Sequence, residues 1–199
     1  MCGKLVVNTG SMFSGKTTEL LRQGKRHVLA KQKVLYIKPD VDTRYSRNEI
    51  VSHTGDYTKA MILSSDEMIC DIQEVNNADV ILVDEVQFFE TGMAIQLNEL
   101  VNDGKIVYVS GLDLDFKGKP FLIVALLMAY ADVVNKFKAV CNDCGSDAHI
   151  SALNELQNER VTLGAGDKYK PLCRCCYDNH LFNIEIQKLK MEVLGNEIY

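Results

Sequence analysis

Residues 10–17 read Gly10-Ser11-Met12-Phe13-Ser14-Gly15-Lys16-Thr17. This octapeptide fits the pattern G-x-x-x-x-G-K-[ST] at every required position. It follows an apolar run at residues 5–7 and opens a helix-like pattern over residues 16–30. A glycine-rich turn between a strand and a helix points backbone N–H groups at phosphate oxygens, and the helix dipole adds to the attraction. The stretch therefore predicts an ATP or GTP site in which all eight residues contact the nucleotide.

A second motif, Val80-Ile81-Leu82-Val83-Asp84-Glu85, supplies carboxylates directly after an apolar run. In phosphate-loop proteins the loop hydroxyl and a strand-end carboxylate hold Mg²⁺, while the loop lysine neutralises the β- and γ-phosphates. We therefore expect Lys16 to bind phosphate and Thr17 and Asp84 to bind Mg²⁺. Glu85 could accept a proton or orient a water molecule. Two acids at a strand end are often only solvated, but a complete phosphate loop beside them favours the catalytic interpretation.

The order of apolar runs predicts an α/β fold. Strand-like runs at residues 34–37, 79–83, 105–109 and 133–140 alternate with helix-like stretches near residues 66–76, 93–102 and 120–131. Such alternation predicts a mostly parallel sheet with helices on both faces, as in phosphate-loop NTPases. We expect Leu20, Leu21 and Val28 to face the sheet from the first helix. Polar residues 42–57 predict an active-site loop.

Five of the seven cysteines lie in residues 141–176, where the composition becomes polar. Cys141 with Cys144 and Cys173 with Cys176 form two C-x-x-C pairs. Four thiolates suit tetrahedral Zn²⁺ and leave no open ligand position, so we expect a structural zinc site and leave Cys175 outside it. A redox role is the alternative for either pair alone. The predicted organisation is a nucleotide-binding domain at 1–140, a small zinc-ribbon-like, substrate-covering domain at 141–180, and a helical tail at 181–199.

Composition excludes several classes of protein. The chain has 199 residues, of which 47% are hydrophobic and 25% charged, with a formal net charge of −5. This is an ordinary globular composition, and the balance of charge gives no general attraction to nucleic acid or anionic lipid. The longest apolar run, starting at residue 121, is shorter than the roughly 18 residues needed to cross a bilayer. With no secretory leader at its start, the chain is expected in the cytoplasm.

From the phosphate loop to the last cysteine, the sequence resembles the zinc-containing thymidine kinases. Besides the phosphate loop, the motifs are KPDVDTRY (38–45), SHTG (52–55), DEVQFF (84–89), GLDLDFKGKPF (111–121), KAVCNDC (138–144) and GAGDKY (164–169), followed by CRCC. The resemblance implies transfer of the ATP γ-phosphoryl group to the 5′-hydroxyl of thymidine, with Mg²⁺ and structural Zn²⁺. It also implies a homotetramer and feedback inhibition by thymidine triphosphate.

The resemblance assigns roles to individual residues. It implies that Glu85 is the general base and that Lys16 and Arg44 are also catalytic residues. Asp42, Asp84 and Gln87 join the loop in binding the nucleotide. The thymidine contacts implied are Met12, Phe88, Leu112, Phe116, Phe121, Ser151, Arg160, Val161, Thr162, Leu163, Gly164 and Tyr169.

The chain also departs from the family pattern. Ser11 replaces a usual proline, residues 150–153 lack a usual basic residue, and the small residues at 164–166 are rearranged. Two other functions stay open at this point. One is a kinase of another deoxynucleoside such as deoxyuridine. The other is an ATPase with a nucleic-acid-binding zinc ribbon, although residues 141–176 carry acidic and basic side chains in similar number.

Overall fold

A parallel sheet forms the centre of the molecule in the computed structural model, which describes residues 2–42, 48–52, 54–154 and 168–195. Within these residues the sheet has six strands in the order β5-β2-β6-β7-β1-β8, and every neighbouring pair is parallel. Their bounds are β1 Lys4–Gly10, β2 Val34–Pro39, β5 Met61–Leu63, β6 Val80–Val83, β7 Ile106–Gly111 and β8 Val133–Phe137.

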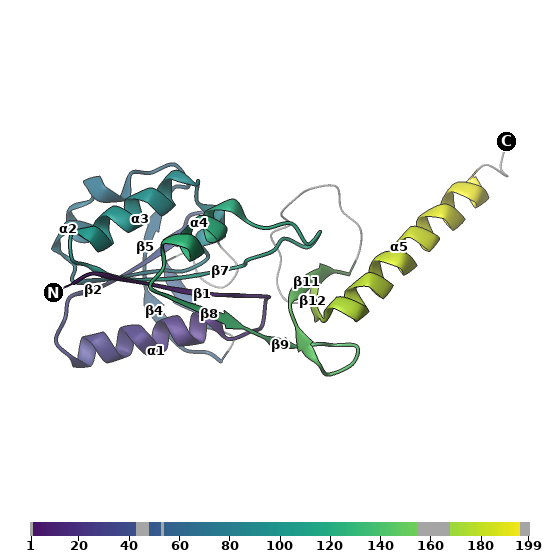
Figure 1. Cartoon of the computed structure of the whole chain (residues 1–199), viewed down its shortest axis with the longest axis horizontal. Coiled ribbons are helices and arrows are strands. Elements are labelled where there is room, and N and C mark those ends of the chain that lie inside the picture. The colour runs from purple at the N-terminus through teal and green to yellow at the C-terminus, as the bar shows by residue number, and fades with distance from the viewer. Residues whose placement is uncertain (1, 43–47, 53, 155–167, 196–199) are drawn as a thin grey trace.

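Helices cover both faces of this sheet, as the sequence predicted. Helix α1 (Lys16–Leu29) lies on one face, while α2 (Gln73–Asn77), α3 (Gly92–Asn102) and α4 (Leu122–Tyr130) lie on the other (Figure 1). The four residues of β6 are all buried, because helices pack on both of its faces. This explains why β6 reads as a continuous apolar run rather than as an alternating one.

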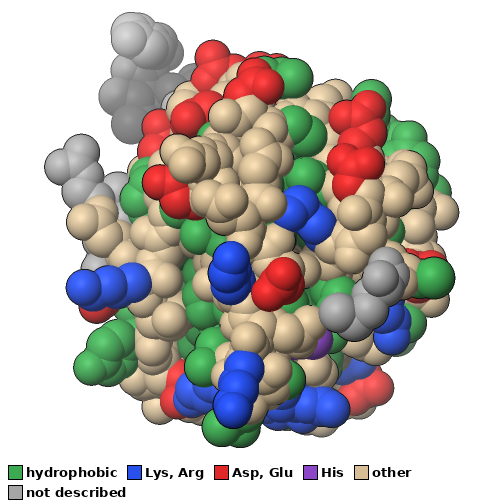
Figure 2. All heavy atoms as spheres, turned by 90° about the vertical axis from the view of Figure 1, so that its left-hand side faces the viewer, with side chains coloured by type: hydrophobic (Ala, Val, Ile, Leu, Met, Phe, Trp, Pro, Cys, Tyr) green, Lys and Arg blue, Asp and Glu red, His purple; other side chains and the backbone are tan. Residues whose placement is uncertain are grey.

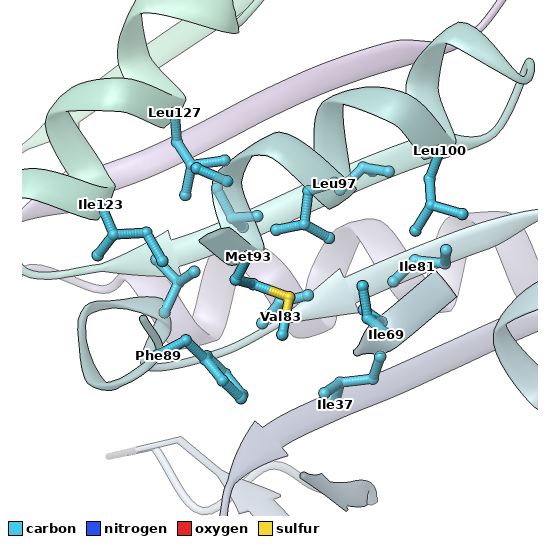
Figure 3. Packing of buried hydrophobic residues seen from close by; sticks show 14 of the residues in the cluster. Ile37, Ile69, Ile81, Val83, Phe89, Met93, Leu97, Leu100, Ile123 and Leu127 are labelled. Atoms are coloured by element: carbon cyan, nitrogen blue, oxygen red, sulfur yellow. The ribbon is translucent and has the colours of Figure 1, made fainter. Parts of the chain in front are cut away.

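The main hydrophobic core fills the space between the sheet and α3 and α4. Strand residues Ile81 and Val83 meet Met93 and Leu97 of α3 and Leu127 of α4 (Figure 3). A smaller cluster under α1 contains Leu20 with Leu82 and Tyr108 of the strands. Transfer of this apolar surface from water is the main term that stabilises the layers. At the amino ends of the strands the described surface mixes acidic and basic side chains (Figure 2).

The continuous helix predicted at residues 66–76 is confirmed only in its second half. The chain forms a 3₁₀ turn, η1 (Ile69–Asp71), and then α2, with Ile72 extended at φ −85° and ψ 123° between them. Ile69 and Val75 are both fully buried. An α-helix turns 100° per residue, so six residues would place the two side chains far apart around the helix. Because Ile72 is extended, the side chains of Ile69 and Val75 both reach the core.

The prediction for Val28 is also wrong, because its side chain is 56% exposed at the last turn of α1. The expected loop at 42–57 contains β3 (Glu49–Val51), which forms an antiparallel hairpin with β4 (Tyr57–Lys59). The expected strand at 133–140 is divided into β8 and β9 (Ala139–Val140), and β9 leaves the main sheet. Strands of two or three residues are too short to produce a periodic pattern.

The cysteine-rich part has a small core of its own. Strand β9 pairs with β10 (Asp147–Ala148), and β11 (Ile150–Leu153) pairs with β12 (Tyr169–Leu172). Helix α5 (Arg174–Gly195) follows β12 directly and extends away from the body (Figure 1). Ala148, Ile150, Leu172 and Tyr177 pack together here. Among the described residues, no helix has both the length and the hydropathy to span a bilayer.

Candidate functional site

The candidate site lies at the carboxyl edge of the sheet. Strand β1 ends at Gly10, β6 at Val83 and β7 at Gly111, and each is followed directly by residues predicted to act in the site. Because the strands are parallel, these ends meet at one edge. This edge faces the cysteine-rich part of the chain (Figure 1). The fold therefore brings sequence-distant motifs together.

The phosphate loop depends on two glycines with positive φ, Gly10 at 137° and Gly15 at 87°. A Cβ on Gly10 would lie 2.2 Å from the Phe137 carbonyl oxygen of the neighbouring strand, so no larger residue fits. Gly15 caps the start of α1 in a left-handed conformation, which glycine adopts without strain. Phe13 also has positive φ, at 64°. The loop is thus held in an unusual backbone path, as expected where backbone N–H groups must surround a ligand.

Lys16 and Thr17 start α1 with their side chains toward the loop and β6. The buried Lys16 Nζ donates to the Ser11 carbonyl oxygen at 2.7 Å. Thr17 Oγ1 lies 3.1 Å from Asp84 Oδ2 and donates to it. A hydroxyl and a carboxylate at this distance form a hard-oxygen donor set of the kind that Mg²⁺ prefers. The predicted magnesium ligands are therefore adjacent in the fold.

Glu85 follows Asp84 in a left-handed conformation, with φ 51° and ψ 40°. It precedes the 3₁₀ turn η2 (Val86–Phe88). Its carboxylate accepts a hydrogen bond from Gln87 Nε2, and Gln87 Oε1 accepts one from the Leu112 backbone N–H at 3.0 Å. Gln87, predicted as a nucleotide contact, is thus buried between Glu85 and the end of β7.

One cavity of about 170 Å³ joins the phosphate loop to the proposed base. Its lining residues are Met12, Phe13, Ser14, Gly15, Lys16, Thr17, Thr18, Thr54, Glu85 and Leu112. Sequence reasoning missed Thr18 and Thr54. Thr54 belongs to the SHTG motif in the turn between β3 and β4, and this motif by itself indicates no chemical role. The cavity combines cation, hydroxyl and carboxylate groups, as phosphoryl transfer requires.

Asp42 reaches this edge through a buried ion pair. Lys38, at the end of β2, is only 2% exposed, and its Nζ lies 3.1 Å from Asp42 Oδ2. The same ammonium donates to the Glu49 carbonyl oxygen at 3.2 Å. Lys38 therefore connects Asp42 to the hairpin whose turn carries Thr54. No sequence pattern indicates this role of Lys38, because the role depends on contacts made by three separate segments.

The remaining predicted contacts are more dispersed. Phe121 is buried in the main core, Phe88 and Tyr169 are half-buried, and Ser151 Oγ accepts a hydrogen bond from the Met12 N–H at 2.8 Å. Phe116 lines a second cavity of about 240 Å³ with Lys117, Leu153, Tyr177, His180, Leu181 and Ile184. Arg44, Arg160, Val161, Thr162, Leu163 and Gly164 lie outside the described residues.

The four paired cysteines form one cluster. The sulfur atoms of Cys141, Cys144, Cys173 and Cys176 all lie within 4.8 Å of one another, and Cys144 Sγ is 3.6 Å from Cys173 Sγ. Zn–S bonds of about 2.3 Å in a tetrahedron place sulfurs roughly 3.8 Å apart, so the arrangement fits such an ion. Hydrogen bonds from the side chain and backbone of Ser146 lower the pKa of the Cys144 thiol to about 6. This favours the thiolate form of Cys144, whereas side-chain hydrogen bonds with Cys173 and Cys144 raise the pKa of the Cys176 thiol.

Comparisons with known proteins find relatives that match most of the chain. The family model described as thymidine kinase matches residues 3–177. A thymidine kinase of Bacteroides fragilis strain YCH46 is 42% identical over 179 residues, covering 90% of this chain and 89% of its own length. Thymidine kinases of Bacteroides thetaiotaomicron and Rhodothermus sp. are 42% and 41% identical over 175 residues, covering 88% of this chain and 87% and 81% of theirs.

Among solved structures, the replication initiator DnaA bound to AMPPCP and single-stranded DNA matches with a TM-score of 0.40 and 15% identity. The match covers 68% of this chain and 40% of that one.

The buried Lys38–Asp42 pair generates a stability prediction. Lys38→Met removes the ammonium from a buried carboxylate, which costs about 3–5 kcal/mol of unfolding free energy. Lys25→Met serves as the control, because Lys25 pairs with Asp56 at an exposed position. We expect chemical denaturation to show a large loss for the first variant and little change for the second. Equal, small shifts in the two midpoints would contradict the prediction.

Proposed function

The chain belongs to the thymidine kinase family, and from this premise we propose that it transfers the γ-phosphoryl group of ATP to the 5′-hydroxyl of thymidine. The observation that carries the proposal is the single cavity shared by Lys16, Thr17 and Glu85. It contains a cation for phosphate, a metal-binding hydroxyl and a carboxylate able to accept a proton. The products would be ADP and thymidine monophosphate, a precursor for DNA synthesis.

The phosphate loop would bind the ATP phosphates through its backbone N–H groups and Lys16. With nucleotide bound, the Lys16 ammonium would exchange its contact with the Ser11 carbonyl for contacts with phosphate oxygens. Mg²⁺, which Thr17 and Asp84 would hold, supplies positive charge against the triphosphate. By the family resemblance, Asp42 and Arg44 complete the phosphate region. Charges placed in advance stabilise the transition state without reorganising during the reaction.

Glu85 would act as the general base. The thymidine 5′-oxygen attacks the γ-phosphorus, its proton passes to the Glu85 carboxylate, and the bond between the γ-phosphorus and the ADP oxygen breaks with its electron pair on ADP. A sugar hydroxyl is a weak nucleophile, so removal of its proton as the new bond forms lowers the barrier. The cavity places the Glu85 side chain beside the phosphate loop, as this role requires.

We propose that thymidine lies on the Met12 and Leu112 side of the cavity. Phe88, Phe116, Phe121, Ser151 and Tyr169 are the further described contacts that the resemblance implies. Thymine is flat and carries one methyl group, which deoxyuridine lacks. A methyl group in an apolar pocket is worth about 1–3 kcal/mol, or roughly 10–200-fold in kcat/KM. Deoxyuridine would therefore be a poorer substrate but still a measurable one.

The cysteine cluster would hold a structural Zn²⁺. Four sulfur ligands complete a tetrahedral shell and leave no position for a reacting water molecule. Cys141 follows β9, while Cys173 follows β12 and precedes α5, so the ion would fasten these segments together. The bond between Ser151 and Met12 then links the fastened segments to the phosphate loop.

We further propose a cytoplasmic homotetramer, on the basis of the resemblance. Helix α4 supports self-association, because its sequence is apolar throughout and its Leu122 is 62% exposed. A helix that is hydrophobic all round is normally buried, and a second copy could cover this face. Sedimentation velocity would measure the state directly.

Steady-state assays test the kinase proposal. The unchanged protein with ATP, Mg²⁺ and each deoxynucleoside should phosphorylate thymidine best. Lys16→Ala should lower kcat/KM by at least about 100-fold, because a principal cation on the transferring group is lost. Lys33→Ala is the control, since Lys33 is exposed at the opposite end of the sheet. A folded Lys16→Ala protein with unchanged kinetics, or no activity on thymidine in the unchanged protein, would refute the assignment.

Elemental analysis tests the zinc proposal. The unchanged protein and Cys175→Ser should each hold about one Zn²⁺ per chain, because Cys175 lies outside the four-sulfur cluster. Cys144→Ser should hold much less, because one of four thiolates is lost. Fully active enzyme that contains no metal would contradict the proposal that the cluster holds a structural Zn²⁺.

Feedback inhibition by thymidine triphosphate is a further proposal. Its thymine would occupy the Met12 and Leu112 side of the cavity, and its phosphates would reach the phosphate loop. One ligand would therefore make the contacts of both thymidine and the ATP phosphates. We expect inhibition competitive with thymidine, and weaker binding to Lys16→Ala by calorimetry. Other deoxynucleoside triphosphates should bind much less well. Equal binding of all four would reject this geometry.

A further inference from the structure

The amide of Gln87 lies between the proposed base and the wall of the cavity. Its Nε2 donates to Glu85 Oε2, and its Oε1 accepts from the Leu112 N–H at 3.0 Å. Gln87 is only 6% exposed and does not line the cavity itself. We propose that Gln87 is a positioning residue that orients the Glu85 carboxylate and ties it to the Leu112 backbone. The inference rests on the proposed function, in which Glu85 is the general base.

The backbone at Glu85 explains why such a contact is needed. Glu85 comes after the end of β6, and its left-handed φ of 51° takes it out of the strand geometry. Its side-chain direction is therefore not set by the pleat of the sheet. A long carboxylate can rotate about three side-chain bonds, and a hydrogen bond from a buried donor restricts that freedom. Gln87 supplies this donor from two residues further along η2.

Among the side chains of this length, only the amide fits both contacts. Glutamine can donate from one terminal atom and accept at the other, whereas an ionised glutamate only accepts and a methionine does neither well. The Leu112 N–H fixes which terminal atom is the acceptor, so the NH₂ group is left facing Glu85. One amide thus sets the relative positions of two cavity-lining residues.

Gly111 gives independent support from another strand. A Cβ at this position would lie 2.9 Å from Gln87 Oε1 and 2.8 Å from Val86 Cγ1. The φ of Gly111 is not in the left-handed region, so the backbone itself does not require glycine here. What requires glycine is the limited space beside the side chains of both Val86 and Gln87. Gly111→Ala should therefore displace the Gln87 amide together with the Val86 side chain, while both Gln87 and Glu85 remain unsubstituted.

Displacement of the base should affect the chemical step more than substrate binding. A misplacement of about 1 Å in a reacting group can lower the rate by about 100-fold. Lys16 donates to the Ser11 carbonyl oxygen in the phosphate loop, whereas the Gln87 amide bonds to Glu85 and the Leu112 N–H. We therefore expect Gln87→Met to lower kcat by roughly 10–100-fold, while KM for ATP changes less than about threefold.

The experiment compares Gln87→Met, Gln87→Glu and Gly111→Ala in the full-length chain, with kcat and both KM values measured for each. Gln87→Glu keeps the length and the acceptor for Leu112 but removes the donor to Glu85, so it tests the contact even if Gln87→Met folds poorly. Gln96→Met is the matched control. Gln96 is also a buried glutamine, at 9% exposure, and accepts from the Ile69 N–H at 2.8 Å in a region outside the cavity.

The inference holds if the Gln87 and Gly111 variants lose kcat and Gln96→Met keeps it at comparable thermal stability. Unchanged kcat in a folded Gln87→Glu protein, while Glu85→Gln is inactive, overturns the positioning role and leaves the proposed function standing. An equal loss of kcat in Gln96→Met would show a general loosening and also overturn it. Absence of thymidine phosphorylation in the unchanged protein would remove both proposals.

Discussion

The close approach of Gly10 to the Phe137 carbonyl oxygen is the constraint on which the site depends. Strand β1 must leave the sheet at this point to form the phosphate loop, and there is no room for a Cβ between the two strands. The departure of the chain here sets where α1 begins, and with it the position of Thr17 relative to Asp84. A larger residue would move the whole loop away from β6. The geometry of the candidate site therefore depends on the absence of a side chain at position 10.

Much of the fold follows from short sequence patterns, and the reasons are physical. Strand β6 is buried on both faces, so its residues form an unbroken apolar run that a sequence reader recognises. The phosphate loop and the cysteine pairs have fixed spacing because backbone or metal geometry demands it. Strands β3, β4 and β5 have three residues each, too few to show a period. Val28 fits a helical pattern, but in the last turn of α1 it is His27 that contacts the sheet, at the Tyr108 hydroxyl, and Val28 is left exposed.

The contacts that sequence reasoning missed are tertiary ones. Lys38 reads as a charge that should lie at the surface, yet it is buried between Asp42 and the Glu49 carbonyl. The family resemblance assigns Gln87 to nucleotide binding, and only the structure shows its bonds to Glu85 and Leu112. Ser151 meets the phosphate loop across 139 positions of sequence. Such roles depend on which segments of the chain pack against each other. The spacing of residues within one segment does not indicate this.

Helix α5 begins inside the second cysteine pair, and this has a consequence for how the helix forms. The first turn of an isolated helix is costly, because several residues are fixed before the hydrogen bonds accumulate. Here the Cys173 carbonyl accepts from the Tyr177 N–H at 2.9 Å, and the Cys173 sulfur lies near the Cys176 N–H. The turn from Cys173 to Tyr177 thus provides the first hydrogen bonds of the helix. Tyr177 and His180 bond to the carbonyl oxygens of Phe116 and Leu153, and beyond them α5 extends away from the body (Figure 1), so the turn at its base favours formation of the whole helix.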